Sequence, residues 1–221
     1  MESAGAPAPF GWLAGKEVCR MYILAINGSP NRKGNTALLL EKVLEAARDE
    51  GVDGKIFHVM DALKDQENPF CMACSSPCKE ACHARSAGLR EACESLEKAA
   101  AVVLGSPVYF GTVSAQLKAF WDKTRAVRSR RSLVGKPAAA VSVGAARFGG
   151  QETTLKALHD MLLIQGMSIV GEGTEEDDAG HQGVCAQRPA GEDSFALERA
   201  RILGRRLASE VKKAAQGKKT P

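Results

Sequence analysis

Residues 23–36 read Ile23-Leu-Ala-Ile-Asn-Gly-Ser-Pro-Asn-Arg-Lys-Gly-Asn-Thr36. A short apolar run ends at a turn of small polar residues and an amphipathic segment follows at once, so this order predicts a strand, a loop and the start of a helix. The loop offers the hydroxyls of Ser29 and Thr36, the side-chain amide of Asn35 and free backbone N–H groups. The helix dipole adds to their attraction for an anion, so these residues predict a site for a phosphorylated cofactor.

Apolar strands alternate with amphipathic helices along the rest of the chain. Strands are predicted at 21–27, 55–60, 101–105, 137–144 and 167–170, and helices at 36–50, 89–99, 113–124, 152–165 and 195–215. Such alternation with short connections predicts a parallel sheet with helices on both faces. Five strands fit an α/β doubly wound parallel sheet in the flavodoxin-like order 2-1-3-4-5, in which a ligand lies beyond the carboxyl ends of the strands.

The pattern predicts a single domain with extensions. Residues 1–20 are rich in Ala, Gly and Pro and predict an irregular arm, 21–215 form the domain, and 216–221 form a basic tail. A cysteine-rich insert over 61–87 follows the second strand. Residues 174–193 are polar and acidic with little periodicity, and the acidic run 175–178 within them predicts an exposed loop. Phe120 and Trp121 lie late in a predicted helix, where a core or subunit contact is expected.

The amino-acid composition argues against several classes of function. Apolar residues make up 44% of the chain and charged residues 25%, which is usual for a soluble globular protein. The net charge of +4 is mild, aromatic residues are only 5%, and no nucleic-acid-reading motif occurs. No segment is apolar enough to predict a membrane span, and residues 1–17 do not match a secretory signal. We therefore expect a cytoplasmic protein that binds neither nucleic acid nor membrane.

Two further loops follow apolar strands and are predicted at the same edge of the sheet. In Ser106-Pro-Val-Tyr-Phe-Gly111, the proline and the last glycine permit a sharp turn, and the two aromatic residues supply flat apolar surface. In Gly144-Ala-Ala-Arg-Phe-Gly-Gly150, the glycines would let backbone approach a planar ligand. The dinucleotide fingerprint does not follow the first strand, so the three loops favour a ligand with a single terminal phosphate. No spacing suggests a catalytic triad or a carboxylate pair, and no catalytic side chain is predicted.

These motifs resemble a known family. Residues 28–36, the run Ser106-Pro-Val-Tyr-Phe-Gly-Thr-Val-Ser-Ala-Gln-Leu-Lys-Ala-Phe-Trp-Asp-Lys-Thr124 and residues 149–154 resemble the NADPH-dependent FMN reductase family, and within it the iron–sulfur flavoproteins. The resemblance covers roughly residues 21–172 and implies FMN. It implies a phosphate site on Ser29, Arg32, Asn35 and Thr36, and a ring site on Pro107, Val108, Tyr109, Phe110, Gly111, Gly149 and Gly150; Gly34 and Gly144 complete the predicted cofactor-binding set.

The insert contains Cys71-Met-Ala-Cys-Ser-Ser-Pro-Cys-Lys-Glu-Ala-Cys82, a dense run of thiols. Soft thiolates at this density favour an iron–sulfur cluster or zinc. The resemblance implies a [4Fe-4S] cluster close to the flavin, with the ligands Cys71, Cys74, Cys78 and Cys82. The gaps of two, three and three residues depart from the family pattern, which has two residues between the second and third cysteines and a longer final gap. Zinc, redox-active thiols and free thiols are the alternatives.

The remaining cysteines and the histidine of this region are predicted to be structural or unpaired. Cys19, Cys93 and Cys185 are isolated in the sequence, which favours packing or free thiols over metal binding. His83 follows the last cysteine of the insert and could act as a ligand, but a solvent-facing position is the preferred interpretation.

An electron-transfer flavoprotein is the function that these features favour. Electrons would enter from a reduced donor through a cysteine-bound cluster, pass to FMN and leave to a small-molecule acceptor, and the resemblance implies ferredoxin as the donor. One alternative is an NAD(P)H-dependent FMN or quinone reductase whose cysteine segment is structural or binds zinc; Arg147 could then meet a nucleotide phosphate, although an exposed arginine is preferred. Another is FMN binding without turnover. The resemblance also implies a homodimer or homotetramer.

Overall fold

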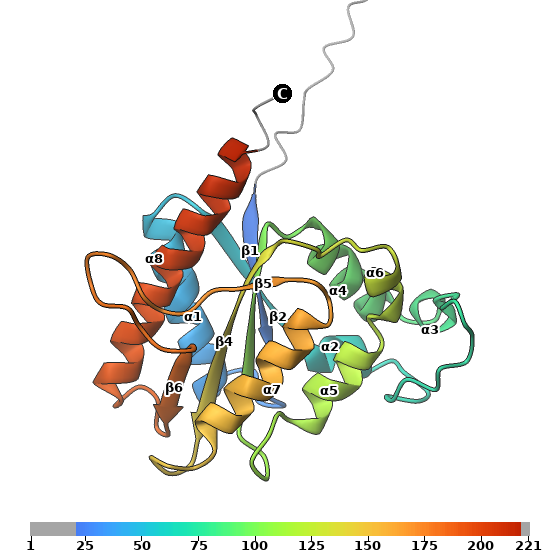
Figure 1. The fold of residues 1–221 in the computed structure, drawn as a ribbon. Helices are drawn as coiled ribbons and strands as arrows, with labels where there is room; N and C mark the ends of the chain where they lie inside the picture. The colour runs from blue at the N-terminus through green and yellow to red at the C-terminus, as the bar shows by residue number, and fades with distance from the viewer. Residues whose placement is uncertain (1–20, 218–221) are drawn as a thin grey trace, which may run out of the picture.

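The computed structural model describes residues 21–217, so the predicted arm at 1–20, including Cys19, and the end of the basic tail lie outside the described residues. A parallel sheet forms the middle layer (Figure 1). Its strands run in the order β2-β1-β3-β4-β5, and β6 is a second partner of β4, which confirms the predicted flavodoxin-like order. The strands are β1 (Tyr22–Asn27), β2 (Asp53–His58), β3 (Ala101–Pro107), β4 (Pro137–Gly144), β5 (Ser168–Ile169) and β6 (Val184–Gln187).

The far edge of the sheet differs from the prediction. β5 is only two residues long and pairs with the start of β4, whereas β6 pairs with β4 from Val141 to Gly144. The sequence predicted no strand within 174–193, so β6 is an element that it missed. A strand of four residues is too short for a clear alternating pattern, so it was recognisable only from its place beside β4.

Helices cover both faces of the sheet (Figure 1). On one face lie α1 (Asn35–Asp49) and α8 (Ser194–Gly217), and on the other lie α2 (Val59–Leu63), α4 (Ala87–Lys98), α5 (Ala115–Asp122) and α7 (Gln151–Leu163). The short helices α3 (Ala81–Ala84) and α6 (Arg125–Ser129) complete the described set. None of the helices within residues 21–217 is long and apolar enough to cross a membrane.

The central strands are apolar along their whole length because both of their faces are buried. Side chains alternate across a strand, so Ile23 and Ala25 of β1 pack with α1 and α8, whereas Leu24 and Ile26 pack with the helices of the opposite face. All four residues are buried. The two apolar clusters thus hold the sheet rigidly between its helix layers.

α1 and α8 approach each other closely at one glycine. A Cβ atom added at Gly204 would lie 2.2 Å from the carbonyl oxygen of Val43 and 2.9 Å from the Cβ of Ala46. Real Cβ atoms do not approach backbone oxygen this closely, so glycine is required for this helix contact. The absence of a side chain at Gly204 thereby lets α8 pack directly against the backbone of α1.

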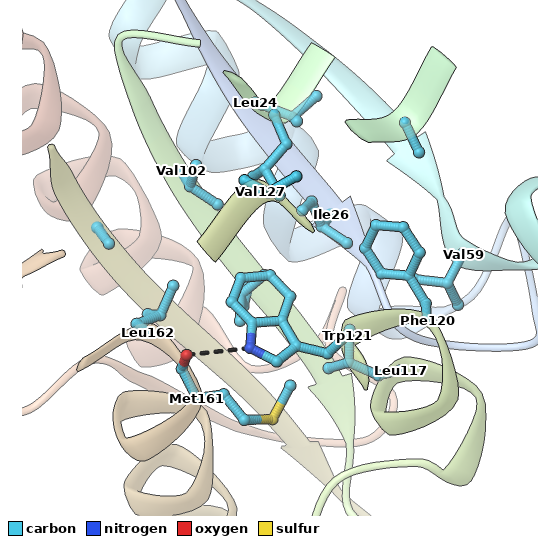
Figure 2. Packing of buried hydrophobic residues seen from close by; sticks show 14 of the residues in the cluster. Leu24, Ile26, Val59, Val102, Leu117, Phe120, Trp121, Val127, Met161 and Leu162 are labelled. Carbon is cyan, nitrogen blue, oxygen red and sulfur yellow. Dashed lines mark hydrogen bonds between the residues drawn. The ribbon is translucent and has the colours of Figure 1, made fainter. Parts of the chain in front are cut away.

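Phe120 and Trp121 lie in the core beneath α5, as predicted, and Figure 2 shows their packing. The indole Nε1 of Trp121 donates a hydrogen bond of 3.0 Å to the carbonyl oxygen of Met161 in α7. A buried indole N–H needs such a partner, and this one joins α5 to α7. The loop that leads from β3 into α5 is therefore anchored at one end by a central strand and at the other by a helix that is held to α7.

Candidate functional site

The loops after β1, β3 and β4 meet at the carboxyl edge of the sheet. The backbone N–H of Gly28 donates to the carbonyl oxygen of Gly105 at 2.8 Å, and the Ser114 hydroxyl donates to the carbonyl oxygen of Gly28 at 2.5 Å. The N–H of Val108 donates to the carbonyl oxygen of Val143 at 2.9 Å. These contacts join the first loop to β3 and to the second loop, and the second loop to the end of β4, at the edge where the doubly wound fold places its ligand.

The first loop is held in shape by its own side chains. Asn27 Oδ1 accepts from the N–H of Ser29 at 3.0 Å, Ser29 Oγ accepts from Asn31 at 3.1 Å, and Asn31 Oδ1 accepts from Lys33 at 3.1 Å. Gly34 is the N-cap of α1, and no side chain caps the first turn of this helix. An uncapped helix N-terminus after a rigid loop is the arrangement that binds phosphate groups.

Two of the predicted phosphate residues also have protein partners. Arg32 pairs with Asp61 of α2, and both side chains are partly exposed. The Oδ1 atom of Asn35 accepts a hydrogen bond of 2.8 Å from the N–H of Ala190, just before α8. The side-chain orientation of Asn35 is thereby fixed, and its Nδ2 group is the part that can donate to an anion. This contact spans most of the chain and has no signal in the local sequence.

His58 supports the first loop, although it belongs to none of the predicted motifs. His58 ends β2 directly opposite Asn27, and its Nδ1 atom lies 3.0 Å from Asn27 Nδ2. The asparagine Nδ2 can only donate, so His58 Nδ1 accepts and is unprotonated. Burial lowers the pKa of His58, the Arg32 guanidinium lowers it further, and Asp61 and Glu41 oppose the shift.

The position of His58 predicts a loss of stability in mild acid. Because its folded-state pKa lies below the unfolded value of 6.5, its contribution is fully present above about pH 6.5 and is lost as the pH falls through the lower value. We expect His58→Asn, whose Oδ1 can still accept from Asn27, to flatten the dependence of unfolding free energy on pH between 4.5 and 7, as measured in urea. Burial also lowers the pKa of His159, which leaves a residual slope, and a variant slope equal to that of the wild type would contradict this role.

The second and third loops contact each other. Tyr109 and Thr112 form a tight turn with paired backbone hydrogen bonds, and Thr153 Oγ1 donates to the carbonyl oxygen of Gly111 at 3.1 Å. Gly150 has a φ of 92°, and a Cβ there would lie 3.3 Å from both Gly111 Cα and Val108 Cγ1. The backbones of these glycines therefore approach each other closely beside the exposed aromatic residues of the second loop.

Gln151 organises the third loop and was not predicted from the sequence. Its Oε1 accepts from the N–H of Gly149 at 2.8 Å, and its Nε2 donates to the carbonyl oxygen of Ala146 at 2.6 Å and to that of Ala186 at 3.2 Å. This buried amide at the start of α7 joins the loop to β6. Gly144, the remaining predicted residue of the loop, ends β4, and its carbonyl oxygen accepts from the N–H of Arg188 at 2.9 Å.

A cleft of about 830 Å³ extends from the third loop towards β6 and the start of α8. Of the predicted cofactor residues, Gly150 lines it; the phosphate loop does not. Arg147 and Arg188 lie on its wall together with Glu152 and Glu192, and Arg147 is exposed, as expected. The uncapped helix N-terminus belongs to the first loop, where the sequence predicts the phosphate site, and not to this cleft.

The cysteine insert presents thiols of different exposure. Cys71, Cys78 and Cys82 are half-buried and Cys74 is exposed. Burial raises the pKa of the Cys82 thiol, the Lys123 ammonium opposes that rise, and Cys78 and Cys71 add to it. Four thiols on one short segment fit a soft metal centre by their chemistry. Within residues 21–217, no set of three or more His, Cys, Asp or Glu side chains is arranged as a metal site.

His83 is buried, so the solvent-facing prediction is wrong. Its side chain is packed where α3 meets α4, its Nε2 donates to the carbonyl oxygen of Lys123 at 3.1 Å, and its Nδ1 lies 3.3 Å from Glu80 Oε1. Cys93 is buried beside it, and burial raises the pKa of this thiol to about 12, in keeping with the packing role expected. Cys185 is half-buried and also a free thiol.

Comparisons with known proteins agree with this geometry. The family model of NADPH-dependent FMN reductase matches residues 21–180. An iron–sulfur flavoprotein of Methanocaldococcus jannaschii is 38% identical over 87% of this chain and 98% of its own length. An NAD(P)H dehydrogenase (quinone) of Aromatoleum aromaticum is 29% identical over 84% of this chain and 94% of its own. A flavodoxin, WrbA-like protein from Agrobacterium tumefaciens is similar in fold, with a TM-score of 0.63, 19% identity and coverage of 87% and 98%.

The family match includes every predicted motif. It extends from β1 through the three loops and the cysteine segment, whereas β6 and α8 lie beyond it. The fold match confirms the flavodoxin-like architecture independently of sequence identity. The chain therefore belongs to the NADPH-dependent FMN reductase family of FMN-binding, flavin-dependent oxidoreductases, as its motifs predicted.

Proposed function

We propose that this protein transfers electrons from a reduced donor to a small-molecule acceptor, with FMN held by the three loops and an iron–sulfur cluster held by Cys71, Cys74, Cys78 and Cys82. When bound, FMN supplies one- and two-electron chemistry and the cluster supplies one-electron chemistry. The observation that carries the proposal is the meeting of three loops beside the uncapped N-terminus of α1, in a chain of a flavin-dependent family.

Each loop contributes a different part of the FMN site. The first-turn amides of α1, the Thr36 hydroxyl and the Nδ2 group of Asn35 donate hydrogen bonds to the phosphate. The joined backbones of Gly111 and Gly150 leave room for the flat ring, and Tyr109 supplies apolar surface. No side chain of the site is required to transfer a proton, and positioning is the protein's contribution.

Two observations support the cluster. Four thiols lie on a single short segment of this chain, and a relative with 38% identity over almost its whole length is an iron–sulfur flavoprotein. Thiolates select iron–sulfur clusters or zinc over harder metal ions, so the chemical test is simple.

The test is metal and sulfide analysis of protein purified without oxygen. We expect about one FMN per chain, together with iron and acid-labile sulfide in equal amounts and broad visible absorbance beyond that of the flavin. A variant with Cys71 and Cys78 replaced by serine should lose iron and sulfide but keep FMN, because these residues lie outside the three loops. Zinc without sulfide in the wild-type protein would overturn the cluster and leave the flavin site.

A second candidate, a quinone reductase that takes hydride directly from NAD(P)H, is favoured by one feature. The cleft beside Gly150 carries Arg147 and Arg188, which could bind a nucleotide phosphate. A relative of this chain is an NAD(P)H dehydrogenase (quinone). Rapid anaerobic bleaching of the flavin by NADPH alone would support this reductase, whereas bleaching only by reduced ferredoxin would support the electron relay.

We further propose that the protein works in the cytoplasm as a homodimer or homotetramer. A flavin site on an exposed edge with aromatic residues at its rim suits a contact with a second subunit. Light scattering after gel filtration measures this directly, and a monomer at micromolar concentration would contradict it.

A further inference from the structure

Lys123 is a buried cation in contact with the cysteine insert. It is the C-cap residue of α5, and only 4% of it is exposed. Its Nζ donates to Gln66 Oε1 and to the carbonyl oxygen of Asn68, both at 2.9 Å. Among the described residues no carboxylate forms an ion pair with it. A buried ammonium with two neutral acceptors is costly unless a nearby negative charge offsets it.

The contacts of Lys123 reach both ends of the cysteine run. Gln66 and Asn68 lie just before Cys71, and Gln66 Nε2 also donates to the carbonyl oxygen of Cys82 at 3.5 Å. On the other side of the run, His83 Nε2 donates to the carbonyl oxygen of Lys123. Lys123, at the end of α5, therefore holds the residues on both sides of the cysteine run in place.

The negative charge that this cation lacks is available in the insert itself. Gln66 accepts from the Lys123 ammonium and donates to the carbonyl oxygen of Cys82, so one side chain joins this cation to the last cysteine of the run. Thiols bind metals as thiolates, so a metal-loaded segment carries several negative charges beside a lysine that is excluded from water.

We propose that Lys123 is a positioning residue and countercation for the cysteine segment: it ties both ends of the run from Cys71 to Cys82 to α5 and offsets the charge of the thiolates when they hold a metal centre. The proposal rests on the proposed function, because it requires that the segment bind a metal. It explains why a lysine is buried at the end of α5 without a carboxylate partner among residues 21–217.

The test is a titration of the reduced apoprotein with Co²⁺ under argon, followed by thiolate-to-cobalt absorbance, which needs neither turnover nor FMN. Compared with the wild type, Lys123→Met is expected to weaken Co²⁺ binding by about tenfold to a hundredfold, the usual effect of losing a partner of the ligands. Lys123→Arg keeps the charge and is expected to bind within about threefold of the wild type. Lys118→Met is the matched control, because Lys118 lies on the same helix and is exposed with its partner Asp122.

Each outcome decides a different point. If Lys123→Met and Lys118→Met bind Co²⁺ as tightly as the wild type, the proposed role of Lys123 is contradicted, whereas the proposed metal site is retained. If Lys123→Met does not fold, as judged by circular dichroism, Lys123→Arg decides: wild-type binding supports the proposal, and a folded arginine variant that has lost cobalt overturns it. If the wild type itself binds neither Co²⁺ nor iron and sulfide, the proposed cluster fails and the role of Lys123 fails with it.

Discussion

Arg199→Leu is expected to lower the free energy of unfolding by about 3–5 kcal/mol, the cost of removing the guanidinium from a buried ion pair. Only 1% of the Glu172 side chain is exposed, its Oε1 lies 3.3 Å from Arg199 Nε and 2.7 Å from the Nδ1 atom of the exposed His181, and its Oε2 has no hydrogen-bond partner in the described structure. Arg199 also donates to the carbonyl oxygen of Glu172 at 2.7 Å and to Asp178 at 2.9 Å. Urea denaturation measures the loss.

A second arginine on the same helix serves as a control, because its substitution removes the same charge from an exposed position. Arg201 is exposed and pairs with Glu198 one turn away, so Arg201→Leu is expected to cost less than about 1 kcal/mol. Adding Glu172→Gln to Arg199→Leu removes the buried charge that has lost its guanidinium partner and should restore part of the lost stability. Equal losses for the two arginine variants would show that the Glu172–Arg199 pair has no special role.

Thr36→Val is expected to weaken FMN binding by about tenfold to a hundredfold, because a hydrogen bond to a charged phosphate contributes about 1.5–3 kcal/mol. Thr36 is 2% exposed, and its methyl group packs over Gly105, where an added Cβ would lie 2.9 Å from Thr36 Cγ2. Valine keeps this methyl and removes only the hydroxyl, so the fold should be retained. Titration of apoprotein with FMN, followed by flavin fluorescence, gives the affinity.

The control for this variant is a buried threonine far from the loops. Thr124 Oγ1 donates to the carbonyl oxygen of Trp121 at 2.7 Å and accepts from Gln165 Nε2 at 2.7 Å, so Thr124→Val should reduce stability by about 1–3 kcal/mol. Its FMN affinity should match the wild type. If Thr36→Val binds FMN as tightly as Thr124→Val, the phosphate is not held at the start of α1.

Most of the fold was predictable because the sequence patterns that define its central strands and helices are local. β1, β3 and β4 are continuous apolar runs between turn residues, and the helix pattern after each fixes a parallel order with few alternatives. The loops at Gly28, Pro107 and Gly144 follow these strands directly, so the fold brings them to one edge. The same reasoning placed Trp121 in the core.

The features that the sequence did not predict depend on contacts between distant segments. β6 is recognisable as a strand only beside β4, and His83 is buried only because α3 packs against α4. The bond from Ala190 to Asn35, and that from Asn27 to His58, join residues whose local patterns carry no sign of each other. Arg199 likewise meets Glu172 and Asp178 only because the chain before β6 passes beside α8.

The bond between Asn35 and Ala190, together with the fit of Gly204 against α1, has a consequence for synthesis. A nascent chain that has left the ribosome only as far as residue 180 has its phosphate loop but lacks the strand and helix that orient Asn35 and cover α1. Half of the outer edge of β4 is also still unpaired at that stage. We therefore expect flavin loading to follow translation of the last helix, because only then is Asn35 oriented and the edge of β4 covered.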